Sequence, residues 1–159
     1  MTLLLKNLAF TVLVPGTVAV YVPLLLAGER WRAASGASLW LGSTALALGA
    51  AVYAWCVLDF ARVGRGTPAP IDAPRRLVAR GPYRYTRNPM YLGVLTVILG
   101  WAILLRSLAV AGYGLGVWLA FHLFAVLYEE PRLRREFGAE YEAYARSVGR
   151  WLPRPRGRR

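Results

Sequence analysis

Four long stretches without a fixed charge are the feature of this sequence that most constrains its fold. Each is close to the length that a helix needs to cross the hydrocarbon core of a bilayer, about 20 apolar residues. They are residues 7–27, 38–58, 88–105 and 107–128. Inside a bilayer the backbone must satisfy its own hydrogen bonds, and a helix does so within one segment. We therefore expect an all-α integral membrane protein with about four transmembrane helices.

The last two stretches are separated by a single residue, Arg106. Two helices joined so closely must run antiparallel, so we expect them to form a tight helical hairpin. The first stretch is longer than the apolar core of a typical signal peptide, and we expect it to remain as a membrane helix. The chain then forms one membrane domain, 1–159, made of two amino-terminal transmembrane helices (1–61), a basic loop (62–87), the hairpin (88–128) and a carboxyl-terminal segment (129–159).

Basic residues gather in the two segments outside the predicted membrane helices. The chain has a formal net charge of +12, with seven Arg and one Asp in residues 62–87 and nine Arg and five Glu in residues 129–159. Membrane proteins keep such basic segments on the cytosolic side. We therefore expect a bacterial-type inner-membrane location, with the loop, both termini and the active site in the cytosol. The arginines flank apolar helices and form no stripe on a soluble domain, so we expect no nucleic-acid partner.

The segment after the last apolar stretch has the pattern of an amphipathic helix, over residues 129–148. Leu133, Phe137, Tyr141 and Tyr144 recur at intervals of four, four and three residues and would form one apolar face. Most other positions are Arg, Glu or Ala, and Gly138 weakens the pattern at one point. We expect this helix to lie on the cytosolic membrane surface and to cap a site there.

Two adjacent carboxylates, Glu129 and Glu130, directly follow the last apolar stretch. A carboxylate at the end of a membrane helix is costly when it is buried without a partner. Arg80, Arg84 and Arg87 of the basic loop are predicted to reach the same membrane face and could pair with it. The two residues are equally consistent with a solvated helix start, where Glu suits the helix dipole. The pattern leaves both interpretations open.

The loop ends in Asn88-Pro89, a sequence typical of a helix start. Asn is a good N-cap, and Pro suits the first turn. That explains both residues structurally, although the free N–H groups of the helix start could also bind an anionic group. Tyr83, Tyr85 and Tyr91 could offer aromatic faces to a cation, or could anchor the chain at the membrane interface.

Two further ionisable residues lie within or beside apolar stretches. His122 either makes a polar contact between helices, the interpretation that we favour, or carries a proton in a cavity. Asp59 is a site candidate because of its depth, and an ion pair with Arg62 is the alternative. The chain has one His and one Cys, so we expect no metal site. Cys56 lies in an apolar stretch, and we expect it to be a small buried hydrophobe.

The second half of the chain carries a spaced set of motifs. They are Gly81-Pro82-Tyr83-Arg84-Tyr85, Arg87-Asn88-Pro89-Met90-Tyr91-Leu92-Gly93, Glu129-Glu130, Phe137-Gly138 and residues 148–153. This set resembles the isoprenylcysteine carboxyl methyltransferases and the phospholipid N-methyltransferases of the same superfamily. The resemblance implies an integral-membrane methyltransferase that uses S-adenosylmethionine. It would methylate a hydrophobic or lipid-like acceptor by direct displacement, at a carboxylate oxygen or an amine nitrogen.

The resemblance also implies which residues form the site. The cofactor-binding residues would be Arg75, Arg76, Leu77, Val78, Tyr83, Asn88, Pro89, Met90, Tyr91 and Glu129. From the chemistry of the residues, and not from the resemblance, we further hypothesise that Arg87 holds an anionic acceptor headgroup and that Glu130 or His122 takes a proton from an amine. Two positions depart from the pattern. Asn88 stands where the isoprenylcysteine enzymes usually have His, although the phospholipid branch admits Asn. Ala125 stands where their eukaryotic members have a substrate-contacting Arg.

Two other functions fit parts of the sequence. Membrane sterol reductases have a similar ending and use NADPH, but they generally have more membrane spans, and the pair Glu129-Glu130 favours methyl transfer. A non-catalytic membrane protein, with its basic loop held to anionic lipid, is the second alternative. It leaves the spaced motifs unexplained. The identity of the acceptor and the oligomeric state are left open by the sequence.

Overall fold

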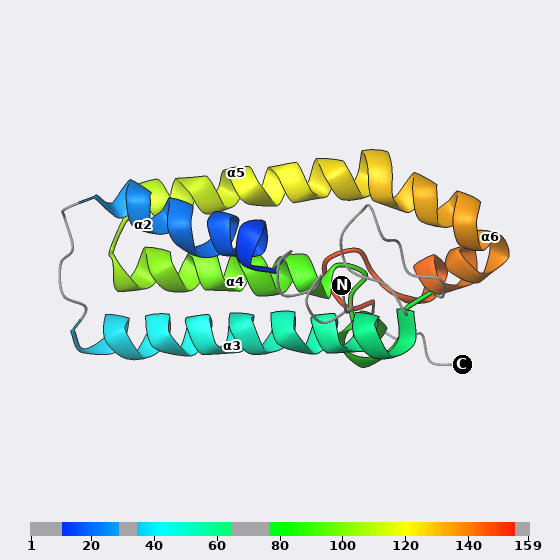
Figure 1. Cartoon of the computed structure of the whole chain (residues 1–159), viewed down its shortest axis with the longest axis horizontal. Helices are drawn as coiled ribbons and strands as arrows, with labels where there is room; N and C mark the ends of the chain where they lie inside the picture. Colours follow the sequence, from blue (N-terminus) through cyan, green and yellow to red (C-terminus); the bar gives the residue numbers. More distant parts are fainter. Residues whose placement is uncertain (1–10, 29–34, 65–76, 155–159) are drawn as a thin grey trace.

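The computed structural model describes residues 11–28, 35–64 and 77–154, which are mostly helical (Figure 1). The helices are α2 (Val22–Ala27), α3 (Ala37–Asp59), α4 (Pro89–Leu104), α5 (Leu108–Phe124) and α6 (Glu130–Ser147). Wider π-helical turns adjoin α2, α3 and the junction of α5 with α6: they are η1 (Thr17–Tyr21), η2 (Phe60–Gly64) and η4 (Ala125–Glu129). A 3-10 turn, η3 (Gly81–Arg84), lies in the basic loop. These residues contain no β-strand, so the prediction of an all-α fold is confirmed.

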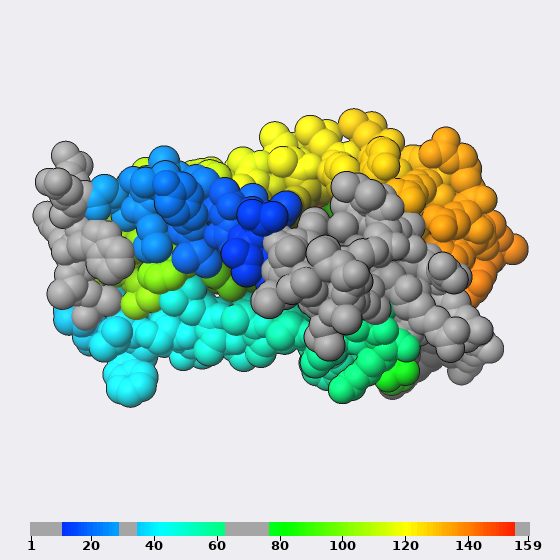
Figure 2. Space-filling view, in the orientation of Figure 1, coloured from blue at the N-terminus to red at the C-terminus, as the bar shows by residue number. Residues whose placement is uncertain are grey.

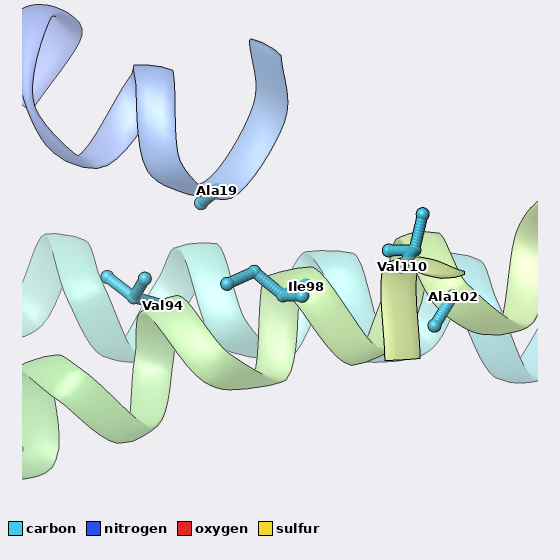
Figure 3. Packing of buried hydrophobic residues seen from close by; sticks show 5 residues of the cluster. All are labelled: Ala19, Val94, Ile98, Ala102 and Val110. Carbon is cyan, nitrogen blue, oxygen red and sulfur yellow. The ribbon is translucent and has the colours of Figure 1, made fainter. Parts of the chain in front are cut away.

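Helix α4 is the central helix of the molecule, in contact with α3, α5 and the η1–α2 segment. Its sequence is apolar on every side, which suits a helix surrounded by other helices. Val94, Ile98 and Ala102 of α4 pack with Ala19 of η1 and Val110 of α5 (Figure 3). This buried cluster joins three of the four apolar segments into one unit.

Helices α3 and α4 approach each other closely at paired glycines. A Cβ atom added to Gly49 would lie 2.7 Å from the carbonyl oxygen of Gly93, and one added to Gly93 would lie 3.0 Å from that of Gly49. A Cβ atom on Gly42 would likewise lie 3.0 Å from the carbonyl oxygen of Gly100. Small residues of this kind let membrane helices pack backbone against backbone. The Ala- and Gly-rich sequence of α3 therefore serves helix packing.

Many apolar residues of the long helices α3 and α5 face outward; Leu115 of α5, for example, is 71% exposed. Figure 2 shows both helices running along the surface of the molecule. Such surfaces are typical of contact with a membrane. Two helices, Ala37–Arg62 and Leu108–Ser147, are long and apolar enough to cross one, whereas Thr11–Ala27 and Pro89–Leu104 are apolar but shorter. The fold supports an integral membrane protein, and the total of four crossings stays a prediction.

Helix α5 passes through η4 into α6, and the combined helix bends at one end of the molecule (Figure 1). The predicted amphipathic helix is therefore present as α6, although it is continuous with the apolar helix before it. Gly138 interrupts α6 with φ +49° and ψ −123°, a left-handed conformation that favours glycine. The bend and this interruption turn the apolar face of α6 back toward the ends of α3 and α4.

Candidate functional site

A cavity of about 740 Å³ lies where α5 passes into α6. This volume is in the range of small-molecule and cofactor sites, about 300–1,000 Å³. Its apolar lining includes Val14, Val18, Val94, Ala120, Phe121 and Phe124. Its polar lining includes Tyr83, Arg87, Asn88, Tyr91, Glu129 and Glu130. The predicted apolar face of α6, Leu133, Phe137, Tyr141 and Tyr144, also lines it. The cavity thus combines an apolar wall with two adjacent carboxylates.

Glu129 ends η4 and is partly buried in the cavity wall. Its Oε2 accepts a hydrogen bond from the hydroxyl of Tyr91, with the two oxygens 2.9 Å apart. The ring of Tyr91 stacks on Phe121 at a centroid distance of 4.4 Å, which fixes the direction of that hydroxyl. No cationic side chain in the described part of the chain pairs with Glu129. Because a desolvated carboxylate is unfavourable without a cation, this wall suits a positively charged ligand.

Glu130, its neighbour, is 5% exposed and surrounded by arginines. Arg150 binds it in a bidentate manner, with Nε 2.6 Å from Oε1 and Nη2 3.1 Å from Oε2. Arg87 Nη1 lies 3.1 Å from the same Oε1, and Arg134 Nη2 lies 3.7 Å from Oε2. Burial alone would raise the pKa of Glu130, but the Arg150 hydrogen bond and the three positive charges outweigh it and hold this pKa below its ordinary value. Glu130 therefore stays ionised.

Residues 148–151 of the carboxyl-terminal segment lie against the loop that precedes α4. The backbone N–H of Arg87 donates to the carbonyl oxygen of Gly149 at 2.9 Å, and Thr86 and Gly149 form an isolated parallel bridge. The hydroxyl of Thr86 donates to the carbonyl oxygen of Arg150 at 2.8 Å. Residues 149 and 150 are therefore hydrogen-bonded to the part of the loop that carries Arg87, whose side chain lines the cavity.

Most of the predicted cofactor-binding residues meet at this cavity. Its lining includes Leu77, Val78, Tyr83, Asn88, Met90, Tyr91 and Glu129. Pro89 is fully buried but is not part of the lining, and Arg75 and Arg76 lie outside the described residues. Asn88 occupies the predicted N-cap position of α4, yet its side chain caps no N–H of that helix. Its Nδ2 donates instead to the carbonyl oxygen of Arg150 at 3.1 Å.

Of the predicted catalytic residues, Arg87 and Glu130 line the cavity and His122 does not. His122 Nδ1 accepts a hydrogen bond from Trp151 Nε1 at 3.1 Å. It therefore makes a polar contact, although with the carboxyl-terminal segment and not with another helix. Asp59 also lies outside the lining; its Oδ1 is 3.6 Å from Nε of Arg80, so its ion pair is not with Arg62. Cys56 is fully buried, as expected.

Sequence reasoning missed the parts of the site that come from distant segments. Val14, Tyr53 and Phe60, from the first half of the chain, line the cavity. In the sequence, a Tyr or Phe in an apolar stretch cannot be distinguished from one that faces lipid. The sequence does not indicate a role for Arg150, because its partner Glu130 lies 20 residues earlier in the sequence. No helical period relates the two positions.

Comparison with known proteins finds a family model and a few relatives that match parts of the sequence. Residues 37–140 match the model of the phospholipid methyltransferase family. Two rice proteins, from subspecies indica and japonica, are each named "Probable protein-S-isoprenylcysteine O-methyltransferase". They are 38% identical over 79 residues, which cover 49% of this chain and 41% of theirs. An "Uncharacterized protein" of Haemophilus influenzae is 39% identical over 64 residues, 40% of this chain and its own full length. No solved structure gives a significant match.

Proposed function

Because the chain belongs to the phospholipid methyltransferase family, we propose that it is a membrane methyltransferase that binds S-adenosylmethionine in the cavity beside α6. The chain covers less than half the length of its rice relatives, whose printed name gives methylation on oxygen. The proposed acceptor is a hydrophobic or lipid-like small molecule. It is methylated at a carboxylate oxygen or an amine nitrogen, on the cytosolic side of the membrane.

The observation that carries this proposal is the state of Glu129. It lines the cavity, receives a hydrogen bond from Tyr91, and pairs with no cationic side chain in the described part of the chain. S-adenosylmethionine bears an ammonium group, which this carboxylate would bind, and a sulfonium, for which the faces of Tyr83 and Tyr91 are suitable neighbours. The cavity of about 740 Å³ has room for a cofactor of this size and an apolar acceptor group.

When bound, the cofactor supplies a methyl group on sulfur, which passes to a lone pair of the acceptor as the carbon–sulfur bond breaks. Such a displacement needs no covalent bond to the protein, so alignment and exclusion of water supply much of the rate. The apolar wall, with Val94, Phe121 and Phe124, excludes water and receives the acceptor's hydrocarbon part. Arg87, whose side chain is 10% exposed, is the proposed binding group for an anionic acceptor headgroup.

The proton acceptor for an amine substrate is proposed to be Glu130 or His122. Glu130 lines the cavity, but the arginines around it make it a weak base. His122 is bound by Trp151 and is not part of the lining. A carboxylate acceptor arrives already deprotonated and needs neither group. The arrangement of these two side chains therefore favours methylation of a carboxylate oxygen over that of an amine.

Calorimetric titration of S-adenosylmethionine into the purified protein in lipid nanodiscs tests the proposal. The wild type should bind saturably, and Glu129→Ala should weaken binding by about tenfold or more, the usual effect of losing a bond to a charged group. Glu140→Ala is the matched control, because Glu140 is exposed on α6 and has no ion pair in the described part of the chain. We expect it to bind like the wild type.

Two results would contradict the proposal in different ways. If folded wild-type protein does not bind S-adenosylmethionine, the methyltransferase assignment fails, and NADPH is the next ligand to titrate. If Glu129→Ala binds as tightly as the wild type, the cofactor lies elsewhere and the proposed site fails. Saturable binding justifies an acceptor screen with methyl-labelled cofactor on membrane extracts.

A further inference from the structure

Arg150 lies outside the cavity lining, yet its guanidinium and its backbone carbonyl oxygen each bind a side chain that belongs to the lining. Its guanidinium binds Glu130, and its carbonyl oxygen binds Asn88. We propose that Arg150 is a positioning residue of this site, which sets the orientation of Arg87 through Glu130 and the orientation of the Asn88 amide directly. The inference rests on the proposed function for what the positioned groups bind, but the positioning itself can be tested without any ligand.

The guanidinium end acts through one carboxylate. Arg150 holds Glu130 by two hydrogen bonds in the planar, bidentate arrangement that gives an arginine–carboxylate pair its directional specificity. The carboxylate oxygen Oε1 that receives Nε of Arg150 also pairs with Nη1 of Arg87. Nη1 of Arg87 donates in addition to the hydroxyl of Tyr141 at 3.2 Å. Among the described residues, Nε of Arg87 is buried without a hydrogen-bond partner, so the polar contacts that direct this side chain are those of Nη1 with Glu130 and Tyr141.

The carbonyl end fixes an amide that could otherwise point either way. The carbonyl oxygen of Arg150 accepts from Nδ2 of Asn88 at 3.1 Å and from the hydroxyl of Thr86 at 2.8 Å. If the amide were flipped, its Oδ1 would face this carbonyl oxygen, and two acceptors would repel. Nδ2 is therefore committed to Arg150. Oδ1 of Asn88 has no donor among the described residues, and it remains available to accept a hydrogen bond from a ligand.

The backbone around Arg150 is held by contacts that do not use its guanidinium. Gly149 accepts from the N–H of Arg87, and Trp151 donates to His122. The N–H of Val148 donates to the carbonyl oxygen of Tyr144 at 2.9 Å. A change of the Arg150 side chain therefore leaves the course of residues 148–151 intact and removes mainly its hold on Glu130. A substitution at Arg150 therefore tests how its side chain orients Glu130, and not whether residues 148–151 stay bound to the loop.

The test compares Arg150→Met, Arg150→Lys and, as a control, Arg135→Met, because Arg135 is exposed on α6. In lipid nanodiscs, Arg150→Met should weaken S-adenosylmethionine binding by about tenfold or more, as expected for loss of a charge-assisted contact. Arg150→Lys should recover part of this loss, because Lys restores the charge but not the bidentate geometry. Arg135→Met should bind like the wild type. A merely structural role would show no graded recovery of affinity between the Met and Lys variants.

The second measurement needs no cofactor. It is a double-mutant cycle between Arg150→Met and Arg87→Met, read from the free energy of unfolding. If Arg150 positions Glu130 for Arg87, loss of Arg150 already weakens the Arg87–Glu130 pair, so the double variant should lose less stability than the sum of the two single variants. Where Arg150→Met does not fold, the same cycle is made with Arg150→Lys, with the same expectation at smaller amplitude.

The outcomes separate this inference from the proposed function. If the wild type does not bind S-adenosylmethionine but the double variant loses less stability than the sum of the single variants, the proposed function fails and the positioning role stands. A double variant that loses as much stability as the sum of the single variants, or more, overturns the positioning of Arg87 by Arg150, whatever the protein binds. If the wild type binds S-adenosylmethionine and Arg150→Met binds it with the same affinity, Arg150 does not influence ligand binding, and that part of the inference is wrong.

Discussion

Two adjacent glutamates show how much a residue's chemistry depends on its surroundings. Glu130 is held by Arg87, Arg134 and Arg150 and stays ionised. Glu129, one position earlier, receives a hydrogen bond from Tyr91 and pairs with no cationic side chain in the described part of the chain. The first is a structural carboxylate whose charge is already compensated. The second is a negative group that a ligand can compensate, and the proposed function depends on this difference.

Replacement of Glu130 by Gln tests its ionisation through stability. Its pKa is lowered on folding, so the ionised form stabilises the folded state fully above the unfolded value, about 4.3. This stabilisation is lost as the pH falls through the lower folded pKa. At pH 7, Glu130→Gln should reduce the free energy of unfolding by about 2 kcal/mol, because the largely buried Arg87 and the half-buried Arg150 lose their charged partner. The difference from wild type should shrink on acidification below about pH 4. A pH-independent difference would contradict this assignment.

Replacement of Asn88 tests the amide orientation fixed by Arg150. Asn88→Asp keeps an acceptor oxygen for a ligand but places a carboxylate oxygen against the carbonyl of Arg150, so S-adenosylmethionine binding should weaken by about tenfold or more. Asn88→His keeps an N–H donor for that carbonyl and should bind within a few-fold of wild type. Calorimetry on both variants measures the difference. Equal affinity in Asn88→Asp and wild type would show that the donor side of Asn88 is unimportant.

At the scale of single residues, the sequence predicts site residues that lie in short motifs, but it does not predict contacts between residues far apart in the chain. Glu129, Tyr91 and Asn88 were predicted site residues, and all three line the cavity. The resemblance supplied that grouping, because the residues alone left a solvated helix start open. The partners Glu130 and Arg150 meet only because α6 folds back toward the loop, and no pattern in the sequence encodes that meeting.

At the scale of elements, hydropathy located the helices and glycine decided how they pack. The predicted stretches 38–58 and 88–105 became α3 (Ala37–Asp59) and α4 (Pro89–Leu104), within one residue at each end. The prediction of both helices rests on uncharged stretches of the sequence. The pairing of Gly49 with Gly93 could not be predicted, because small residues indicate a close approach without naming the partner. The π-helical turns were not predicted either, since no pattern in this sequence distinguishes them from α-helix.

A single methyl group should disturb the contact between α3 and α4. Gly49→Ala places a Cβ atom 2.7 Å from the carbonyl oxygen of Gly93, so the helices must separate. We expect a loss of about 1–3 kcal/mol in the free energy of unfolding, as for other overpacked sites. Gly116→Ala is the control, because a Cβ atom there meets nothing within 4 Å, and alanine is the better helix former. Unfolding titrations in detergent measure both variants. Equal free energies of unfolding for Gly49→Ala and Gly116→Ala would contradict the close contact between α3 and α4.

At the scale of the whole molecule, the two ends differ in chemistry. One end holds the turn between α4 and α5, with Arg106 and the exposed Leu108. The other holds the cavity, the ion-pair network and α6 (Figure 1). The charges of the loop and the tail predict that the cavity end faces the cytosol. Composition carries this information, so orientation could be predicted although the paths of individual side chains could not.

Cysteine labelling tests that orientation. The native Cys56 is fully buried, so a membrane-impermeant maleimide should not label the wild type. Leu108→Cys, at a residue 90% exposed beside the α4–α5 turn, should be labelled in intact bacterial cells that express the protein. Arg135→Cys, on the exposed side of α6, should be labelled only in inverted membrane vesicles. The reverse pattern would place the cavity on the outer side of the membrane.

The contacts of residues 148–151 with the site form between segments that the ribosome makes at different times. The ribosome makes every apolar helix before it makes these residues, so insertion into the bilayer can begin while Glu130 still lacks Arg150 and Asn88 still lacks its acceptor. A chain that ended before residue 148 would contain every apolar helix of the structure but neither Arg150, the bidentate partner of Glu130, nor the acceptor for the Asn88 amide.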